Sequence, residues 1–306
     1  MSYAYTFLVR PHTRPHTRPH TRPHTRPHTH PTPTHPSTPH PTQPQVDRPS
    51  LECPARVAVS MLRAADASNN TDIVVLVPHS VRIRVPGATV RPVAVAAFKG
   101  HGSWENTFMK FRAVQLYEYD RVMFLDLDLL VLASPRYLFA SAPATFTVAA
   151  PRAYWLGQPF LQSGGPMVFR PSLGLYDRFK TVLDGPRSSR QYPGEMDWFN
   201  EVFKDDAVAL DGIETMLSGE FVPTDRVYAW WGKRMWVNAS TTLRRATFLH
   251  FIATWKPWVH HPQPRTPELV SVYNRWARIK QNVCATVEPT RSRPRGGRAG
   301  GGGHPR

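Results

Sequence analysis

The chain has 306 residues, a net charge of +16 and only two cysteines, Cys53 and Cys284. Two cysteines can build neither a disulfide framework nor a cysteine-based zinc cluster. No run of 18 uncharged apolar residues is present, so we expect no transmembrane helix. By sequence the protein is then soluble and cytoplasmic, and a Golgi location stays open if the N-terminus is incomplete.

Both ends of the chain are of low complexity and carry most of the charge. Residues 10–29 are five copies of Arg-Pro-His-Thr, and sequence rich in Pro, His and Thr continues to residue 50. Proline in every repeat prevents a regular helix or sheet, so we interpret 10–50 as a disordered insertion or linker. Residues 1–50 and 289–306 each carry +5, and the second is a disordered Gly/Arg-rich tail. Such charge attracts nucleic acid or anionic membranes, but without interleaved aromatic residues it gives no firm evidence for nucleic acid.

Residues 2–9, SYAYTFLV, are a strand-like segment separated from the rest of the chain. We interpret residues 1–9 as containing the first strand of the central domain, with 10–50 inserted in the loop that follows. A long surface insertion costs little, because the closure entropy of a loop grows only with the logarithm of its length. The alternative is that this segment is not part of the fold.

The central residues, 51–288, alternate between strand and helix patterns and are numerous enough for one domain. Helices are predicted at 54–67, 104–119, 172–183, 195–203 and 267–281. Strands are predicted at 72–77, 90–97, 122–128, 146–150, 167–169 and 247–251. This alternation predicts an α/β fold with a mostly parallel sheet.

The stretch RVMFLDLDLLVLASP, residues 121–135, places two aspartates at the end of an apolar strand. Residues i and i+2 of an extended chain point to the same side, so Asp126 and Asp128 project together. Two carboxylates that close repel unless a cation compensates them, and carboxylate oxygens suit Mg²⁺ or Mn²⁺. Ligands of open α/β sheets bind beyond the carboxyl ends of strands. The alternative is a strand end whose acids pair with arginine or cap a helix.

A histidine and a lysine follow the last predicted strand, in the segment HFIATWKPW that begins at His250. Imidazole with two carboxylates can hold Mn²⁺ and leave positions open for phosphate oxygens. Lys256 beside that metal would neutralise a diphosphate. An isolated histidine is more often an ordinary residue, and Trp255 and Trp258 are typical of packing.

Four segments in order resemble the family 8 glycosyltransferases, the glycogenin-like group with the GT-A fold. The family's central block of helix, strand, D-x-D and following strand is matched by FMKFRAVQLYEYDRVMFLDLDLLVLASPRYLF. Three shorter family segments are matched by SGGPMVFRPS, GEMDWFN and HFIATWKPW. The resemblance covers most of residues 51–260, together with residues 3–9. It implies a Rossmann-like, mostly parallel central sheet with flanking helices in a single domain with disordered tails.

The resemblance also implies roles for the residues that match. Asp126, Asp128 and His250 would be the ligands of Mn²⁺, with Mg²⁺ as the alternative ion. The residues implied to act in catalysis are Lys110, Glu195 and Asp197. The residues implied to bind substrate are Tyr5, Thr6, Gln162, Ser163, Gly164, Gly165, Lys256 and Trp258, of which Lys256 would contact the donor's diphosphate.

The chain departs from the family pattern at a few of these positions. Ser163 stands where the family has Asn, and Gln162 is a candidate to supply the amide instead. Glu195 stands where Asp is usual, and Asp197 is a second candidate for the acid. Ala253 replaces a glycine whose missing side chain lets the backbone approach the phosphates.

The implied function is metal-dependent transfer of a hexose from a UDP-linked sugar to a hydroxyl acceptor on a glycan, protein or lipid, with retention of anomeric configuration. Two rivals remain. A haloacid-dehalogenase-like phosphatase also uses D-x-D after an apolar strand, although there the motif opens the domain. A catalytically degenerate member of the family could act as a binding protein through its basic ends.

Overall fold

The structure is a computed structural model that describes residues 1–9, 51–68, 70–98, 106–156, 160–185, 194–221, 239–252, 256–258 and 266–285. The predictions for 10–50 and 289–306, and those that involve Ala253 and Trp255, lie outside these residues. Within the described part, no helix is both long and apolar enough to cross a bilayer.

Most of the described strands form one sheet of seven, in the order β3-β2-β1-β4-β7-β6-β8. Their bounds are β1 Tyr3–Leu8, β2 Thr71–Pro78, β3 Thr89–Val93, β4 Arg121–Leu125, β6 Val148–Pro151, β7 Met167–Phe169 and β8 Ala207–Leu210. The pairs β1–β2, β1–β4, β2–β3 and β6–β8 are parallel, whereas β7 runs antiparallel to both β4 and β6. The prediction of an α/β fold with a mostly parallel sheet is confirmed.

The N-terminal strand β1, which residues 10–50 separate from the rest of the chain in sequence, lies inside this sheet. β1 pairs with β2 on one side and with β4 on the other, for example at Thr6, which lies opposite Val74 and Phe124. Its residues from Ala4 to Leu8 are buried. A strand with a neighbour on each side and buried on both faces needs a continuous apolar run, which explains the composition of residues 3–8.

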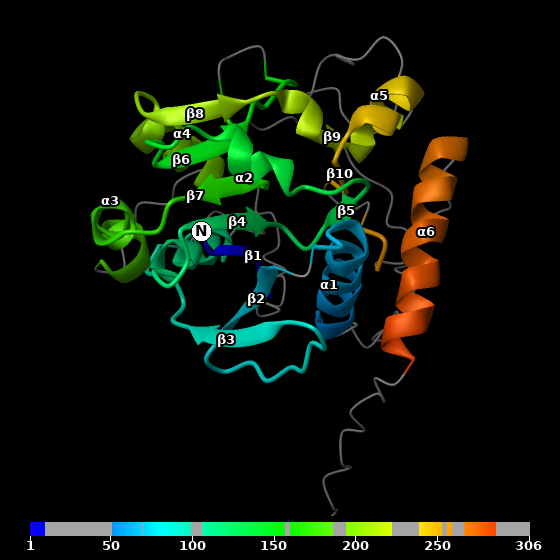
Figure 1. Cartoon of the computed structure of the whole chain (residues 1–306), viewed down its shortest axis with the longest axis horizontal. Helices are drawn as coiled ribbons and strands as arrows, with labels where there is room; N and C mark the ends of the chain where they lie inside the picture. The colour runs from blue at the N-terminus through cyan, green and yellow to red at the C-terminus, as the bar shows by residue number, and fades with distance from the viewer. Residues whose placement is uncertain are drawn as a thin grey trace, which may run out of the picture.

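Helices cover both faces of the sheet (Figure 1). One face packs against α1 Glu52–Ala65 and α6 Pro267–Cys284, which lie side by side. The other packs against the 3₁₀-helix η2 Thr107–Gln115, α3 Leu173–Asp184 and α4 Glu195–Phe203. Aromatic side chains fill the second core: the ring of Phe179 lies 4.8 Å from that of Phe111 and 5.1 Å from that of Phe203.

A second, smaller sheet has the order β5-β10-β9. Its strands are β5 Leu129–Val131, β9 Thr215–Leu217 and β10 Phe248–His250. The remaining elements are α2 Tyr137–Ser141, α5 Ala239–Arg245 and the 3₁₀-helices η3 Gly212–Glu214 and η4 Ser218–Phe221. Patterns in the sequence did not predict β8, β9, α2 or α5, and only the family resemblance implied a strand at β5. Segments of three to seven residues rarely show a period, although short strands were predicted at 167–169 and 247–251.

Several predicted elements differ from the structure in length or type, and one of them is the strand predicted over 122–128, which ends at Leu125. The helix predicted over 104–119 is described from residue 106 on as the 3₁₀-helix Thr107–Gln115, whose residues 107–114 are all buried and therefore lack a polar face. The strand predicted over 90–97 ends at Val93. Pro92 cannot donate a hydrogen bond to a neighbouring strand, and β3 accordingly lies at the edge of the sheet.

The two cysteines, from which we expected no disulfide framework, form a single disulfide between Cys53 and Cys284. Cys53 lies in the first turn of α1 and Cys284 is the last residue of α6. The bond therefore joins the two helices that cover one face of the sheet.

Candidate active site

The two aspartates of the D-x-D motif lie where the chain leaves the main sheet. β4 is buried along its length between β1 and β7 and ends at Leu125. Asp126 and Asp128 follow in a tight turn, in which the amide of Leu129 donates to the carbonyl of Asp126 at 3.2 Å. Because β4 is parallel to β1 and β2, this turn lies at the edge where the parallel strands have their carboxyl ends.

The small sheet brings His250 to the same place. β10 is antiparallel to β5, and His250 is paired with Leu129, directly after the acidic motif. The amide of Phe251 donates to the carbonyl of Asp128 at 2.9 Å, which fixes the two segments against each other. His250 Nε2 lies 3.2 Å from Asp128 Oδ1.

Asp126, Asp128 and His250 form a group that can hold a metal ion, since one ligand atom from each lies within 4.8 Å of the others. Asp128 Oδ1 is buried and, although His250 Nε2 lies 3.2 Å away, no described group makes a well-aligned hydrogen bond to it. A buried carboxylate oxygen without a hydrogen bond is costly unless it has another partner, such as a cation. Two carboxylates and an imidazole suit Mn²⁺ and also accept Mg²⁺, so the donor set fits the predicted ion.

Lys256 supplies positive charge on one side of this group. Its ammonium group donates to Asp128 Oδ2 and to the carbonyl of Phe251. Burial alone would raise the pKa of Asp128, but Lys256 and then His250 outweigh it and hold that pKa well below its usual range. Asp128 is therefore ionised and ready to bind a cation at neutral pH.

Lys110 supplies positive charge on the other side and is entirely buried. Its ammonium group donates to Asp126 Oδ2 at 3.2 Å, to Glu195 Oε1 at 3.0 Å and to the carbonyl of Ser163 at 2.8 Å. A buried ammonium ion is tolerated only when it is paired and hydrogen-bonded, and here all three of its protons have an acceptor. The side chain thus links η2 to the acidic turn and to the first residue of α4.

Glu195 is held in the first turn of α4, where the helix dipole favours a negative charge. Its Oε1 also accepts a hydrogen bond from the hydroxyl of Ser163 at 3.2 Å. The exposed Asp197 lies two residues further along the helix. Of the two acids predicted here, the structure therefore joins Glu195, and not Asp197, to the lysine network.

Gly164 lies so close to the metal-binding group that no other residue would fit. A Cβ atom at this position would be 2.8 Å from His250 Cε1 and 3.3 Å from Asp126 Oδ2. Gly165 has a φ of +99°, which favours glycine. The hydroxyl of Thr215 donates to its carbonyl at 3.3 Å. The segment 163–165 therefore lies against Asp126 and His250, whereas Lys256 contacts Asp128.

The structure does not bring Tyr5 to this group. Its hydroxyl donates to Asp66 Oδ2 at 3.0 Å, and Asp66 is the residue that ends α1. Because α1 returns from the carboxyl end of β1 to the start of β2, Asp66 lies at the edge of the sheet away from the acidic motif. Thr6 is fully buried within β1 and is paired with Phe124 of β4. Its hydroxyl has no hydrogen-bond partner among the described residues.

Gln162 and Trp258 have other contacts. The amide nitrogen of Gln162 donates to the carbonyl of Arg152 at 2.9 Å, and its amide oxygen is buried with no hydrogen-bond partner among the described residues. The ring of Trp258 lies 6.2 Å from that of Trp276 on α6, which is a packing contact. Their predicted roles in substrate binding remain predictions.

Two residues that support the site had no signal in the sequence. Thr215 on β9 holds the carbonyl of Gly165, and the hydroxyl of Ser218 accepts a hydrogen bond from the amide of Ile252 at 3.2 Å. Thr215 begins the three-residue strand β9 and Ser218 directly follows it. A strand this short has no hydrophobic period by which the sequence could predict it. They fix the backbone on two sides of the site and do not carry charge.

The sheet order and the arrangement of the strands are those of the GT-A fold, as the similarity to two solved structures shows. The galactosyltransferase LgtC, solved with donor and acceptor sugar analogs, aligns with a TM-score of 0.51 and 17% identity over 78% of this chain and 94% of that one. The bifunctional glycosyltransferase WbbM aligns with a TM-score of 0.54 and 19% identity, over 76% of this chain and 48% of that one.

Two curated fungal proteins are similar in sequence, and both are named glucose N-acetyltransferase 1. The protein from Gibberella zeae is 29% identical over 188 residues, which are 58% of this chain and 40% of that protein. The protein from Aspergillus fumigatus is 27% identical over 226 residues, which are 68% of this chain and 56% of that protein. The chain thus spans about half the length of these relatives. No protein-family profile matches it.

Proposed function

We propose that the protein is a metal-dependent glycosyltransferase that takes its sugar from a nucleotide-diphosphate donor. The observation that carries this proposal is the convergence of Asp126, Asp128 and His250 at the carboxyl edge of a GT-A sheet, between two lysine ammonium groups. The side chains of Asp126 and Asp128 are 14% and 18% exposed, so a ligand can reach them.

The charges of the site suit a diphosphate. Three carboxylates, of Asp126, Asp128 and Glu195, face two ammonium groups, of Lys110 and Lys256. These five groups sum to a charge of −1, so together they attract a cation rather than an anion. A divalent ion changes the sum to +1, and a diphosphate can then bind against it.

When bound, the metal ion would supply Lewis-acid stabilisation of the leaving diphosphate. Asp126, Asp128 and His250 would hold it. Lys256, whose ammonium group reaches the edge of the metal-binding group, would offer its protons to phosphate oxygens as negative charge develops there. Lys110 is buried and fully hydrogen-bonded, so its role is to hold Asp126 and Glu195 in place.

We further propose that the protein is a family 8 enzyme that uses Mn²⁺ and a UDP-linked hexose and retains the anomeric configuration. The four matching sequence segments support this, since they contain the acidic motif, Gly164, Glu195, His250 and Lys256 in the order of that family. The acceptor would be a hydroxyl group on a glycan, protein or lipid. Among the residues that the structure describes, we assign none as a nucleophile.

The name of the two fungal relatives refers to glucose and to an N-acetyl group. A donor panel for this chain should therefore contain UDP-glucose, UDP-galactose, UDP-N-acetylglucosamine and acetyl-coenzyme A. Transfer from acetyl-coenzyme A and from no UDP-sugar would overturn our assignment of the reaction. Release of inorganic phosphate from sugar phosphates without sugar transfer would favour the phosphatase alternative.

The first experiment is calorimetric titration of UDP into the purified protein with and without Mn²⁺. We expect binding that requires the metal, and a loss of about tenfold or more in Asp128→Asn and in His250→Ala, because each removes one metal ligand. Asp177→Asn, an exposed aspartate on α3, is the matched control and should bind like the parent. Metal-independent binding, or binding unchanged in both ligand variants, would contradict the proposal, and no binding at all would favour a degenerate protein.

A further inference from the structure

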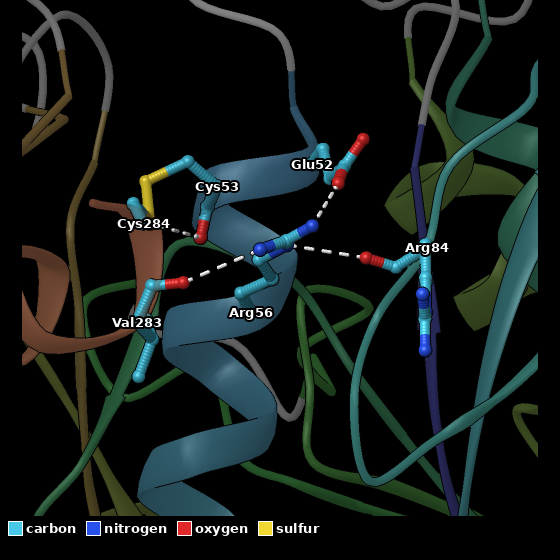
Figure 2. Close-up of a disulfide and its surroundings, with 6 residues drawn as sticks. All are labelled: Glu52, Cys53, Arg56, Arg84, Val283 and Cys284. Atoms are coloured by element: carbon cyan, nitrogen blue, oxygen red, sulfur yellow. Dashed lines mark hydrogen bonds and ion pairs between the residues drawn. A yellow bond between two sulfur atoms is a disulfide. The ribbon is translucent and has the colours of Figure 1, made fainter. Parts of the chain in front are cut away.

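The disulfide lies at one end of the pair of helices that cover the sheet (Figure 2). Cys53 is in the first turn of α1 and Cys284 ends α6, and the two are separated by 231 positions in the chain. The bond therefore closes a covalent loop around nearly the whole described fold. A long loop is the case in which a disulfide restricts the unfolded chain most.

Arg56 reinforces the same junction. Its guanidinium donates to the carbonyl of Val283 at 3.4 Å, to the carbonyl of Arg84 at 3.1 Å and to the carboxylate of Glu52 (Figure 2). Val283 is in the last turn of α6, whose carbonyls have no partner within the helix and favour a cation. The C-terminal end of α6 is thus fixed to α1 by one covalent bond and one arginine.

The other half of α6 packs against the segments that carry His250 and Lys256. The ring of Tyr273 lies 5.2 Å from that of Phe251 in an edge-to-face arrangement. The ring of Trp276 lies 6.2 Å from that of Trp258. Phe251 directly follows His250, and its carbonyl accepts a hydrogen bond from Lys256, so α6 forms the wall behind this side of the site.

We propose that the Cys53–Cys284 disulfide is a redox-dependent clamp that closes in an oxidising compartment and holds α6 against the wall of the donor site. The effect on the donor site rests on the proposed function, whereas the clamp itself does not. Without the bond, the C-terminal end of α6 loses its covalent link to α1 and keeps the hydrogen bond from Arg56 and the packing of Ile279 and Val283. The segments of residues 248–252 and 256–258 then lose part of their support.

Closing the clamp converts two thiols into one disulfide and releases two protons and two electrons. An oxidised dithiol oxidoreductase or glutathione disulfide accepts them by thiol–disulfide exchange and is itself reduced. Such bonds persist in secreted and lumenal proteins and are rare in the cytosol. The structure therefore favours a lumenal or extracellular place of folding over the cytoplasmic location that the sequence suggested.

The first test is the thiol content of the protein, expressed with and without an oxidising compartment and alkylated before and after reduction. We expect no reactive thiol in the oxidised protein and two after reduction. Two alkylated cysteines in protein that folded in an oxidising compartment would overturn the proposal.

The second test compares oxidised protein, reduced protein and Cys53→Ser/Cys284→Ser. Reduction should lower the melting temperature by at least about 5 °C and weaken Mn²⁺-dependent UDP binding by about fivefold or more. Reductant should change neither property of the double variant, which is the matched control. If the double variant does not fold, the reduced parent protein gives the same comparison.

Hydrogen exchange separates this proposal from the proposed function. Peptides covering residues 248–258 and 269–284 should exchange faster after reduction, whether or not the protein binds UDP. If exchange and melting change while no UDP binds to either form, the clamp stands and the donor assignment fails. If neither exchange in these peptides nor melting responds to reduction, the disulfide is not a clamp and the proposal fails.

Discussion

Replacing Lys110 by methionine removes the cation that links η2 to the partly exposed Asp126 and the buried Glu195. The ammonium group is fully buried and lies 3.2 Å from Asp126 Oδ2 and 3.0 Å from Glu195 Oε1. Methionine has nearly the same length and fits the apolar surroundings, which include the ring of Phe124 at 5.6 Å from the ammonium group. The change therefore tests the charge and not the packing.

The expected cost is large because two carboxylates stay behind. Breaking a buried ion pair by removing one partner typically costs about 3–5 kcal/mol, and the carbonyl of Ser163 also loses its donor. Whole domains are stable by only about 5–15 kcal/mol. We therefore expect the variant to fold but to lose about 3–5 kcal/mol of unfolding free energy. The double variant Lys110→Met/Glu195→Gln should recover part of this loss, because it removes one of the two uncompensated charges.

Urea unfolding followed by tryptophan fluorescence measures this loss. Lys180→Met, an exposed lysine on α3, is the matched control and should change the unfolding free energy by less than about 0.5 kcal/mol. The slope of free energy against urea must stay constant across the variants, since a change of slope would mean that the unfolded or native state has changed.

Two results would refute the reasoning. If Lys110→Met costs no more than Lys180→Met, the buried network does not contribute to stability. If Lys110→Met and the double variant lose the same free energy, Glu195 is not coupled to Lys110 and the network has been assigned wrongly.

Two further variants test the site and its surroundings. Gly164→Ala should weaken Mn²⁺-dependent UDP binding by about tenfold or more, because its Cβ would be 2.8 Å from His250 Cε1, whereas Gly174→Ala, with no atom within 4 Å of its Cβ, should bind normally. Binding by Gly164→Ala at the parent's affinity would mean that His250 is not needed. Burial raises the pKa of Glu214 from 4.5 to about 7, so the folded state prefers the protonated acid and stability falls as pH rises from 4.5 through 7. Glu214→Gln should remove this fall. In urea unfolding it should be more stable than the parent by about 3 kcal/mol at pH 8 but not at pH 4. The prediction is contradicted if the variant and the parent differ in stability by the same amount at both pH values, or if the exposed Glu201→Gln gains as much.

The sequence predicted the elements of the main sheet well where they are long and strongly apolar. Residues 3–8 are apolar or aromatic except for Thr6, residues 73–77 are a continuous apolar run, and both segments lie in central or near-central strands. The helices at 195–203 and 267–284 have apolar residues at helical spacing. The missed elements β8, β9, α2 and α5 are only three to seven residues long and are formed by contacts with their neighbours rather than by a period of their own.

The prediction of the site shows a similar division. Asp126, Asp128 and His250 were predicted together from the motifs, and the structure places their ligand atoms within 4.8 Å of one another. The arrangement of Lys110 around Glu195 and the carbonyl of Ser163 could not be predicted, because it depends on how η2 and α4 meet. Every residue has a backbone carbonyl, so the sequence cannot indicate that the carbonyl of Ser163 is the one that accepts from Lys110.

Tyr5 shows why a residue matched by its position in a strand can still point elsewhere. Its neighbours in β1 alternate between two cores, with Tyr5 and Phe7 on the side of α1 and Ala4 and Leu8 on the side of η2. Its long side chain then extends to Asp66 at the end of α1. Only the three-dimensional position of Asp66 decides which edge of the sheet the hydroxyl reaches.

The position of His250 depends on the register of a very short sheet. β10 has three residues, and His250 faces the acidic motif because it is paired with Leu129 and because Phe251 donates to the carbonyl of Asp128. A slip of one residue would turn His250 to the opposite face of the sheet. Two hydrogen bonds oppose such a slip at the ends of the strand, from Leu132 to the carbonyl of Thr247 at 2.8 Å and from Phe251 to Asp128 at 2.9 Å. The small sheet therefore does more than pack Leu130, Phe248 and Leu249 into the core, because it also fixes the third ligand of the proposed metal site.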